Sequence, residues 1–351
     1  MVFRTWISSA ALALIAITGA GCANAAPPET AALVPQAAST SRYTAPGPYK
    51  VETERGKWHD AKRDRDVPWL IRYPQDTDGP RPVMVFSHGL GGSREGLPRM
   101  SEFLVSHGYI VVHVQHPGSD VSMWKGVRPD PATVDRGAML KTASDPAVML
   151  NRFADIPFAM GELGKMAVDG KFAGKIDMGR VAMSGHSFGA VTTQVAAGQV
   201  FKTGAAMPAD GFRAFIAMSP SGDRDGDDKA AFANVTKPFL MMTGTEDGFA
   251  LNPSVETAED RLQPYYGLPE GLPAVLVNLT GGDHFVFSGS ILTRGKDRPL
   301  DPRHHEIIDA AVLAFLDAYL MDDPGAREWL ANGLAGLART DASIETRNVT
   351  P

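Results

Sequence analysis

The chain has 351 residues, of which 44% are hydrophobic and 21% charged, and its formal net charge at pH 7 is −6. This composition is typical of a soluble globular protein and provides enough apolar residues for one large domain with its own core. The mild excess of acidic residues argues against nucleic acid or an anionic membrane surface as the main partner.

Residues 1–25 have the pattern of a bacterial-type export signal. Arg4 gives a short positive region, residues 6–20 are apolar, and Ala23-Asn24-Ala25 forms a small-x-small cleavage site. We expect cleavage after Ala25 and a periplasmic or secreted protein; the alternative is a buried N-terminal helix.

The one cysteine of the chain, Cys22, ends a Gly-Ala-Gly-Cys stretch that resembles the lipobox of bacterial lipoproteins, although glycine replaces the usual leucine. Lipidation of Cys22 would tether the protein to a membrane surface, whereas simple cleavage would remove it. In both cases the mature domain has no disulfide and no cysteine-based metal or redox site.

Residues 26–48 are rich in Ala, Pro, Ser and Thr without apolar periodicity, which is typical of a flexible leader. We expect one domain over residues 49–340 and a disordered tail over residues 341–351. No internal repeat divides the domain.

The domain begins with an expected antiparallel hairpin, formed by residues 49–54 and 67–73 around a charged turn. Continuous apolar runs then indicate strands buried on both faces at residues 82–86 and 109–114, with a helix between them over residues 97–107. Strands and helices that alternate in this way form parallel βαβ units.

The later segments continue this alternation. Helices are expected over residues 145–167, 190–200, 303–320 and 326–337, and strands over residues 212–218, 239–243 and 274–279, the last being the final strand. The sequence therefore predicts an α/β fold with a mostly parallel central sheet, helices on both faces and an antiparallel N-terminal edge.

An apolar run at residues 181–184 ends in Gly185-His186-Ser187-Phe188-Gly189, and the helix-like run follows. A serine on a tight strand-to-helix turn needs glycine two positions away on either side, because side chains there would clash. The order of strand, Gly-x-Ser-x-Gly and helix is that of a nucleophile elbow, which exposes the Ser187 hydroxyl at the positive end of a helix.

The strand at residues 82–86 leads into Ser87-His88-Gly89-Leu90-Gly91-Gly92, a glycine-rich turn whose N–H groups can approach a ligand closely. Beside an elbow, such a turn supplies one N–H of an oxyanion hole, and the residue after the nucleophile supplies the other. We therefore expect Leu90 and Phe188 as the two donors. The alternative is a plain strand-to-helix turn, and His88 is expected to have a structural role there.

A serine nucleophile needs a neutral imidazole as base and a buried carboxylate that orients the imidazole. Asp247 and His284 each follow an expected strand in a glycine-rich turn, at the same sheet edge as Ser187 and in the chain order Ser, Asp, His. The alternatives are neighbouring or later residues of the same chemical type: Glu246 and Asp283 as the acid, and His304 and His305 as the base.

Residues 115–136 form a long loop that leaves the carboxyl end of a strand, where open α/β sheets bind ligands. We expect Trp124 of this loop, Tyr265 and Phe285 to line the substrate cleft, although a surface excursion explains the loop equally well. No three-ligand metal constellation is recognisable, so we expect neither a metal nor a cofactor.

The stretches at residues 86–92 and 185–190 together resemble the platelet-activating factor acetylhydrolase and dienelactone hydrolase group of α/β-hydrolases, over about residues 49–320. The resemblance implies an α/β-hydrolase fold, a serine esterase for short or oxidised acyl esters without metal or cofactor, and the roles given above for Ser187, Leu90 and Phe188. The acetylhydrolase proper has its acid after the strand that follows the elbow, where this chain reads Met218-Ser219-Pro220-Ser221. The acid is therefore expected at Asp247, as in dienelactone hydrolases and cutinase-like polyester hydrolases.

The expected function is that of an exported carboxylester hydrolase that cleaves a small-molecule or lipid ester through an acyl-enzyme. One alternative is a cutinase-like polyester hydrolase or a lipase. The other is a catalytically silent hydrolase fold that binds a ligand, because a fold alone does not establish an activity.

Overall fold

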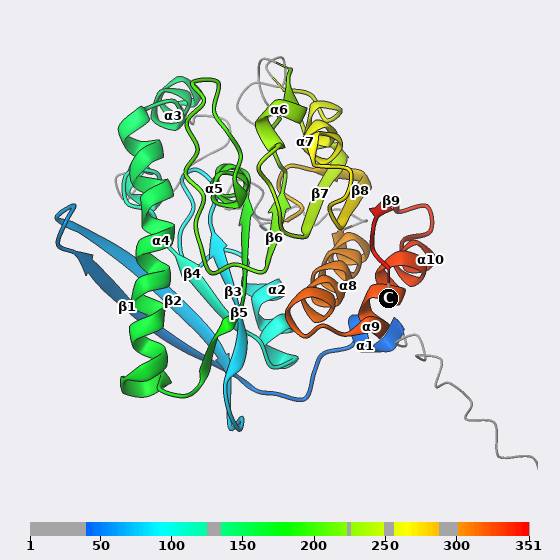
Figure 1. The fold of residues 1–351 in the computed structure, drawn as a ribbon, viewed down its shortest axis with the longest axis horizontal. Coiled ribbons are helices and arrows are strands. Elements are labelled where there is room, and N and C mark those ends of the chain that lie inside the picture. Colours follow the sequence, from blue (N-terminus) through cyan, green and yellow to red (C-terminus); the bar gives the residue numbers. More distant parts are fainter. Residues whose placement is uncertain (1–39, 125–134, 223–225, 249–255, 288–300, 351) are drawn as a thin grey trace, which may run out of the picture. The chain divides into compact units, whose positions relative to one another are not determined.

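The computed structural model describes residues 40–124, 135–222, 226–248, 256–287 and 301–350. The export segment expected over residues 1–25, including Cys22, lies outside these ranges. Within the described ranges one nine-stranded sheet organises the fold, in the order β1-β2-β4-β3-β5-β6-β7-β8-β9 (Figure 1). Its strands are β1 (Val51–Asp60), β2 (Arg65–Pro74), β3 (Arg81–Ser87), β4 (Ile110–Val114), β5 (Ile176–His186), β6 (Ala214–Met218), β7 (Phe239–Glu246), β8 (Ala274–Asp283) and β9 (Ala342–Arg347).

Neighbouring strands from β4 to β8 in this order are parallel, whereas the pairs β1–β2, β2–β4 and β8–β9 are antiparallel. The expected mostly parallel sheet with an antiparallel N-terminal edge is confirmed. All residues of β4 and β6 are buried, as the continuous apolar runs of their sequences predict. Because parallel strands end at the same edge of a sheet, the loops after β3, β5, β7 and β8 lie together.

The hairpin at the edge is longer than expected. Its strands continue through the charged residues, and only residues 61–64 form the turn. The reason is the alternation of side chains along β1: Trp58 is buried, while Lys57 and His59 on the opposite face remain in contact with solvent. Charged residues on one face of an edge strand do not end it.

The helices cover both faces of the sheet. They are α1 (Thr40–Thr44), α2 (Pro98–Ser106), α3 (Arg136–Ala143), α4 (Pro146–Val168), α5 (Phe188–Ala197), α6 (Asp228–Phe232), α7 (Gln263–Gly267), α8 (Asp301–Leu320), α9 (Pro324–Glu328) and α10 (Leu334–Ala338), with the short turns η1 (Val121–Trp124), η2 (Gly170–Phe172), η3 (Asp260–Leu262) and η5 (Trp329–Gly333). None of the helices in the described ranges combines the length and the apolar character needed to cross a bilayer.

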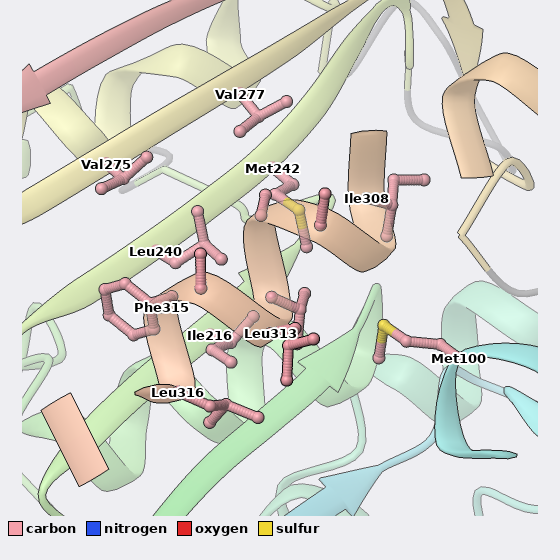
Figure 2. Close-up of a cluster of buried hydrophobic side chains, with 14 of the residues drawn as sticks. Met100, Ile216, Leu240, Met242, Val275, Val277, Ile308, Leu313, Phe315 and Leu316 are labelled. Atoms are coloured by element: carbon pink, nitrogen blue, oxygen red, sulfur yellow. The ribbon is translucent and has the colours of Figure 1, made fainter. Parts of the chain in front are cut away.

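Two apolar cores follow from the alternation of side chains along the strands. Met84 and Phe86 of β3 point into the core beneath α2 and α8, and Val83 and Val85 point into the core beneath α4 and α5. Figure 2 shows α8 on the first of these cores, with Leu313 and the other labelled side chains between the helix and the strands. The sheet is therefore buried on both faces and holds its loops on a rigid base.

The expectations for the two ends of the domain are corrected by the structure. Part of the expected flexible leader is the helix α1, whose Tyr43 is fully buried with its ring centroid 4.3 Å from that of Trp329. Part of the expected disordered tail is β9, which pairs with β8 over six residues, so the strand at residues 274–279 is not the final one. The sequence of β9 is mostly polar because it is an edge strand, and every residue of it after Ala342 keeps some contact with solvent.

Replacing Tyr43 with alanine should lower the free energy of unfolding by about 3 kcal/mol, because it removes a buried ring from its contact with Trp329 and leaves a cavity. Tyr266→Ala is the matched control, since the side chain of Tyr266 is 44% exposed and its loss should cost about 0.5 kcal/mol. Urea denaturation measures both. An equal loss of stability in the two variants would contradict the docking of α1.

Candidate active site

The nucleophile elbow lies between β5 and α5. Ser187 has a φ of 57° and a ψ of −117°, a strained backbone conformation, and its N–H donates to the Met218 carbonyl at 2.9 Å. A β-carbon on Gly185 would lie 2.1 Å from the Gly189 oxygen, and one on Gly189 would lie 1.9 Å from the Ser87 oxygen. Only glycine fits at these two positions, for the steric reason that the motif predicts.

The structure brings the three predicted triad residues into one chain of hydrogen bonds. The Ser187 Oγ lies 2.9 Å from the His284 Nε2, and the His284 Nδ1 lies 2.8 Å from the Asp247 Oδ1. Asp247 follows β7 and is fully buried, His284 follows β8 and is 6% exposed, and Ser187 is partly exposed. The arrangement places a hydroxyl, an imidazole and a carboxylate in the order that nucleophilic catalysis requires.

The turn after β3 lies against the elbow. A β-carbon on Gly89 would lie 3.4 Å from the Ser187 Cβ, so the N–H of Leu90 belongs to a segment next to the nucleophile. Within the described residues, the N–H groups of Leu90 and Phe188 donate no hydrogen bond to a turn, a loop or a side chain. Two backbone donors from two segments are thus left for a ligand beside Ser187.

The sheet order, the elbow and the positions of the three side chains decide the fold class. The chain has the α/β-hydrolase fold. Residues 66–132 match the family model of platelet-activating factor acetylhydrolase, isoform II, a stretch that runs from β2 past the turn after β3. No curated protein matches the chain. The match covers less than half of the chain and indicates a hydrolase of the platelet-activating factor acetylhydrolase type.

The acid of this α/β-hydrolase site is held in its charged form. Burial by itself raises the pKa of Asp247, but the hydrogen bond from His284 and the nearby charges of His284 and Arg261 outweigh it, so the pKa of Asp247 lies below its usual range. The second carboxylate oxygen accepts a hydrogen bond from the Thr243 hydroxyl at 2.9 Å. By contrast, Glu246 is exposed, and Asp283 accepts the N–H of Phe285 at 3.2 Å. These contacts distinguish Asp247 from both alternative acids.

Arg261 organises the loops around the acid, which the sequence did not indicate. Its side chain is buried, its Nε donates to the Asp247 carbonyl at 3.2 Å, and the same Nε lies 3.7 Å from the Asp247 Oδ1. Its Nη1 donates to the Pro220 carbonyl at 3.1 Å and to the Ser221 hydroxyl at 2.9 Å. The guanidinium therefore joins the loop after β6, where the acetylhydrolase proper carries its acid, to the loop that carries Asp247 here.

Three histidines that are not in the triad hold the loop of His284. Each places a ring nitrogen against a backbone carbonyl, and a carbonyl can only accept, so each ring donates. The acceptors are the carbonyls of His284 (2.8 Å from His186), Thr280 (2.9 Å from His304) and Val286 (3.1 Å from His305). His304 and His305, the alternative bases, thus connect α8 to the end of β8 and the segment that follows His284, and no hydrogen bond joins them to Ser187 within the described residues.

Two of the three expected cleft residues lie beside the site. The Trp124 Nε1 donates to the Gly91 carbonyl at 2.8 Å, which places its ring against the turn after β3. The ring of Phe285 is partly exposed and stands edge-on to that of His284, with centroids 5.4 Å apart. The expectation for Tyr265 is wrong: this side chain is 1% exposed and packs beneath Arg347 of β9, as a core residue.

No metal site is visible in the part of the chain that the structure describes, where no group of three or more His, Cys, Asp or Glu side chains could hold an ion. Residues 220–229 contain four aspartates, and this acidic run is only partly covered, because Asp223 and Asp225 lie outside the described residues. Asp227 of the same run caps α6 by accepting the N–H of Ala230 at 3.0 Å.

Four of the buried histidines have a pKa below the usual range: His88, His113, His116 and His186. Burial lowers the pKa of each, to about 4 for His116 and about 3 for His186, because the imidazolium loses its hydration. His88 shows the neutral form directly, since its Nε2 accepts the His116 N–H at 3.0 Å while its Nδ1 lies 2.7 Å from the Gly89 carbonyl. The structural role expected for His88 agrees with these contacts.

The buried histidines predict a loss of stability in mild acid. On unfolding, each regains its ordinary pKa and binds a proton below about pH 6.5, so the unfolded state binds more protons and stability falls as pH falls. Between pH 7 and pH 5 each such histidine should lower the free energy of unfolding by about 2 kcal/mol. Urea denaturation across this range measures the slope, and a level profile would contradict the burial of neutral imidazoles.

Proposed function

We propose that the chain is a serine-dependent carboxylester hydrolase that works through an acyl-enzyme. The observation that supports this most directly is the continuous hydrogen-bonded chain from the Ser187 hydroxyl through His284 to the buried carboxylate of Asp247. The nucleophile lies on a strained elbow and is partly exposed, whereas the acid is fully buried. This combination is that of a catalytic triad.

The proposed reaction follows from these contacts. An ionised Asp247 can only accept, so the His284 Nδ1 carries the proton and the Nε2 lone pair faces the Ser187 hydroxyl. The Ser187 Oγ attacks the acyl carbonyl while its proton moves to His284 Nε2, and the carbonyl oxygen becomes an oxyanion. The imidazolium then protonates the leaving alkoxide as the C–O bond breaks. A water molecule attacks the acyl-enzyme by the same route, releases the carboxylic acid and restores Ser187.

The N–H groups of Leu90 and Phe188 are the proposed oxyanion donors. They belong to the turn after β3 and to the first residue of α5, and the partial positive charge at the start of α5 adds to their effect. Donors that are in place before the reaction stabilise the transition state without reorganisation, and each is typically worth about 10²- to 10³-fold in kcat.

We further propose short-chain or oxidised acyl esters as the substrate class. The match of residues 66–132 to the acetylhydrolase family supports an acetyl-sized acyl group. The displaced acid and its Arg261 contacts depart from the acetylhydrolase proper, so a phospholipid alcohol is not part of the proposal.

A series of p-nitrophenyl acetate, butyrate and octanoate tests the acyl group. We expect kcat/KM to be highest for the acetate and at least roughly tenfold lower for the octanoate, as for a pocket too small for the longer chain. A preference for the octanoate would contradict the short-acyl assignment and favour the lipase or cutinase-like alternative.

Ser187→Ala should lower kcat on p-nitrophenyl acetate by about 10⁴- to 10⁶-fold, because the acyl-enzyme can no longer form. Its stability should change little, since the strain of the elbow resides in the backbone. A fluorophosphonate should label Ser187 in the unmodified protein, as peptide mass spectrometry can show. Labelling that persists in the alanine variant would disprove the assignment of the nucleophile.

Asp247→Asn should lower kcat by about 10²- to 10⁴-fold, because an amide can donate to His284 Nδ1 and then favours the wrong imidazole tautomer. Asp283→Asn is the matched control: the amide oxygen can still accept the Phe285 N–H, so kcat should stay within about threefold. If Asp283→Asn proves the more damaging substitution, Asp247 is not the acid.

A further inference from the structure

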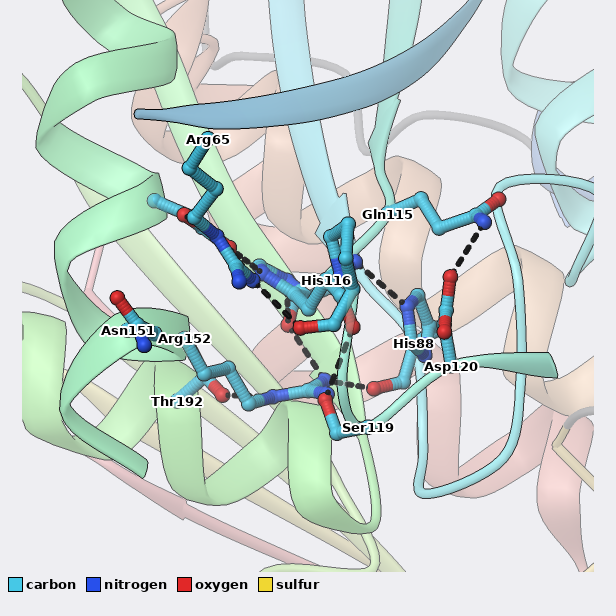
Figure 3. Close-up of polar contacts among 12 residues, drawn as sticks. Arg65, His88, Gln115, His116, Ser119, Asp120, Asn151, Arg152 and Thr192 are labelled. Atoms are coloured by element: carbon cyan, nitrogen blue, oxygen red, sulfur yellow. Dashed lines mark hydrogen bonds and ion pairs between the residues drawn. The ribbon is translucent and has the colours of Figure 1, made fainter. Parts of the chain in front are cut away.

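A buried polar cluster lies beneath the oxyanion turn, and the proposed mechanism does not use it (Figure 3). We call it the Arg152 cluster. It consists of Arg152 and Asp155 of α4, Ser87 and His88 of the turn after β3, His116 and Ser119 of the loop after β4, and Thr192 of α5. Arg152 is fully buried, and burial lowers the pKa of its guanidinium to about 9, below the usual range, while the negative charges nearby act against this shift.

Arg152 holds the oxyanion turn from two sides. Its Nη2 donates to the Ser87 hydroxyl at 3.0 Å and to the His88 carbonyl, immediately before the segment that carries Leu90. Its Nη1 donates to the Ser119 hydroxyl at 2.9 Å, and the Ser119 carbonyl accepts the Gly91 N–H at 2.8 Å. The guanidinium therefore contacts the turn directly before Leu90 and is linked to it through Ser119 after Leu90.

The same guanidinium also holds the start of the elbow helix. Its Nε donates to the Thr192 hydroxyl at 2.7 Å, and this hydroxyl donates in turn to the Phe188 carbonyl at 2.9 Å. The guanidinium carbon of Arg152 lies 4.6 Å from the centroid of the Phe188 ring, a favourable cation–π distance. One planar group thus contacts both segments that carry the proposed oxyanion donors.

The remaining members of the cluster balance the buried charge. The Ser87 Oγ lies 3.0 Å from the His116 Nε2, and the His116 Nδ1 lies 3.0 Å from the Asp155 Oδ2. The Asp155 carboxylate also pairs with Arg63 and Arg65. This Ser–His–Asp order is the order of a triad, but all three side chains are fully buried and no substrate can reach them. Its role is therefore structural: it gives the buried cation and its carboxylate the partners that they need.

We infer that Arg152 is a positioning residue of the oxyanion hole, which fixes the separation of the Leu90 and Phe188 N–H groups without contacting the substrate. The inference rests on the proposed function. Both donors must lie about 2.7–3.1 Å from one oxygen, although they come from different segments. A group bonded to both segments can hold this spacing, and Arg152 makes such bonds to each. Its loss should weaken binding of the transition state and leave binding of the ground-state ester nearly unchanged.

The test compares Arg152→Gln, Arg152→Lys and Thr192→Val with the unmodified enzyme. Each is assayed for kcat and KM on p-nitrophenyl acetate and for inhibition by a trifluoromethyl ketone, whose adduct with Ser187 places an oxyanion in the hole. For Arg152→Gln we expect kcat to fall by about 10²-fold, KM to stay within about threefold, and the inhibition constant to rise as kcat/KM falls. Arg152→Lys should recover part of the rate, because it keeps the charge but cannot span all the acceptors.

Thr192→Val and Arg72→Gln make the test independent of general loss of stability. Thr192→Val removes the acceptor of the Arg152 Nε and the donor to the Phe188 carbonyl, but leaves the bonds of Arg152 to Ser87 and His88 in place. It should lower kcat by about tenfold, which decides the question if Arg152→Gln does not fold. Arg72 is a buried arginine that contacts His113 on β4, so Arg72→Gln should lower stability and leave kcat within about threefold. A fall in kcat of similar size in Arg72→Gln would overturn the inference.

The outcomes separate the inference from the proposed function. If Ser187 is labelled and active, but folded Arg152→Gln and Thr192→Val keep their kcat and their affinity for the trifluoromethyl ketone, only the inference is overturned. A rise in KM at constant kcat also overturns it, because that result would indicate a role in substrate binding. If the unmodified chain neither hydrolyses esters nor reacts with a fluorophosphonate at Ser187, the proposed function fails, and the inference fails with it.

Discussion

The direct contact between the backbone of the elbow and the backbone of the turn after β3 is the constraint on which the site depends. A β-carbon at Gly189 would stand 1.9 Å from the Ser87 oxygen, so no side chain can separate the two segments. Because of this contact the two segments lie side by side, and the N–H groups of Leu90 and Phe188 lie in the segments next to Ser187. The same contact leaves Ser187 in a backbone conformation that the surrounding elements must maintain.

Two buried arginines flank this contact and hold the irregular loops on its two sides. Arg152 binds hydroxyl and carbonyl oxygens on the oxyanion side, and Arg261 does the same on the acid side. Loops at a strand edge have carbonyl groups without partners in a sheet or helix, and a guanidinium with five donors satisfies several at once. Hydrogen bonds to buried cations therefore help to position these loops, an arrangement that specifies geometry but is costly to disturb.

The parts of the site that the sequence predicted are those set by local sterics and by chain order. The elbow needs glycines within two positions of Ser187, and such a requirement is visible in five residues. Whether Asp247 or Glu246 is the acid depends on which of these two neighbouring side chains points toward His284 at the turn. The spacing of residues along the sequence cannot give this direction. The directions of the Tyr265 and Tyr266 side chains could not be predicted for the same reason. Tyr265 is buried beneath Arg347, whereas Tyr266 is exposed.

The features that the sequence did not reveal depend on contacts between distant segments. The hydrogen-bonding partners of Arg152 lie 33 to 65 residues away along the chain, so no local pattern marks it as buried. The strand β9 is similar: its polar residues are typical of a loop, and they form a strand only because the edge of β8 accepts them.

The position of β9 in the chain also affects how the edge of the sheet is closed during folding. In the sequence, β9 follows all three residues of the proposed triad. The strand β8 ends next to His284, and its outer edge stays open until β9 pairs with it. Until then, a growing chain presents an unpaired parallel-sheet edge to other chains, a state that favours aggregation. Docking of β9 therefore closes the sheet edge beside His284, and a chain without the β9 segment should aggregate more readily than the 351-residue chain.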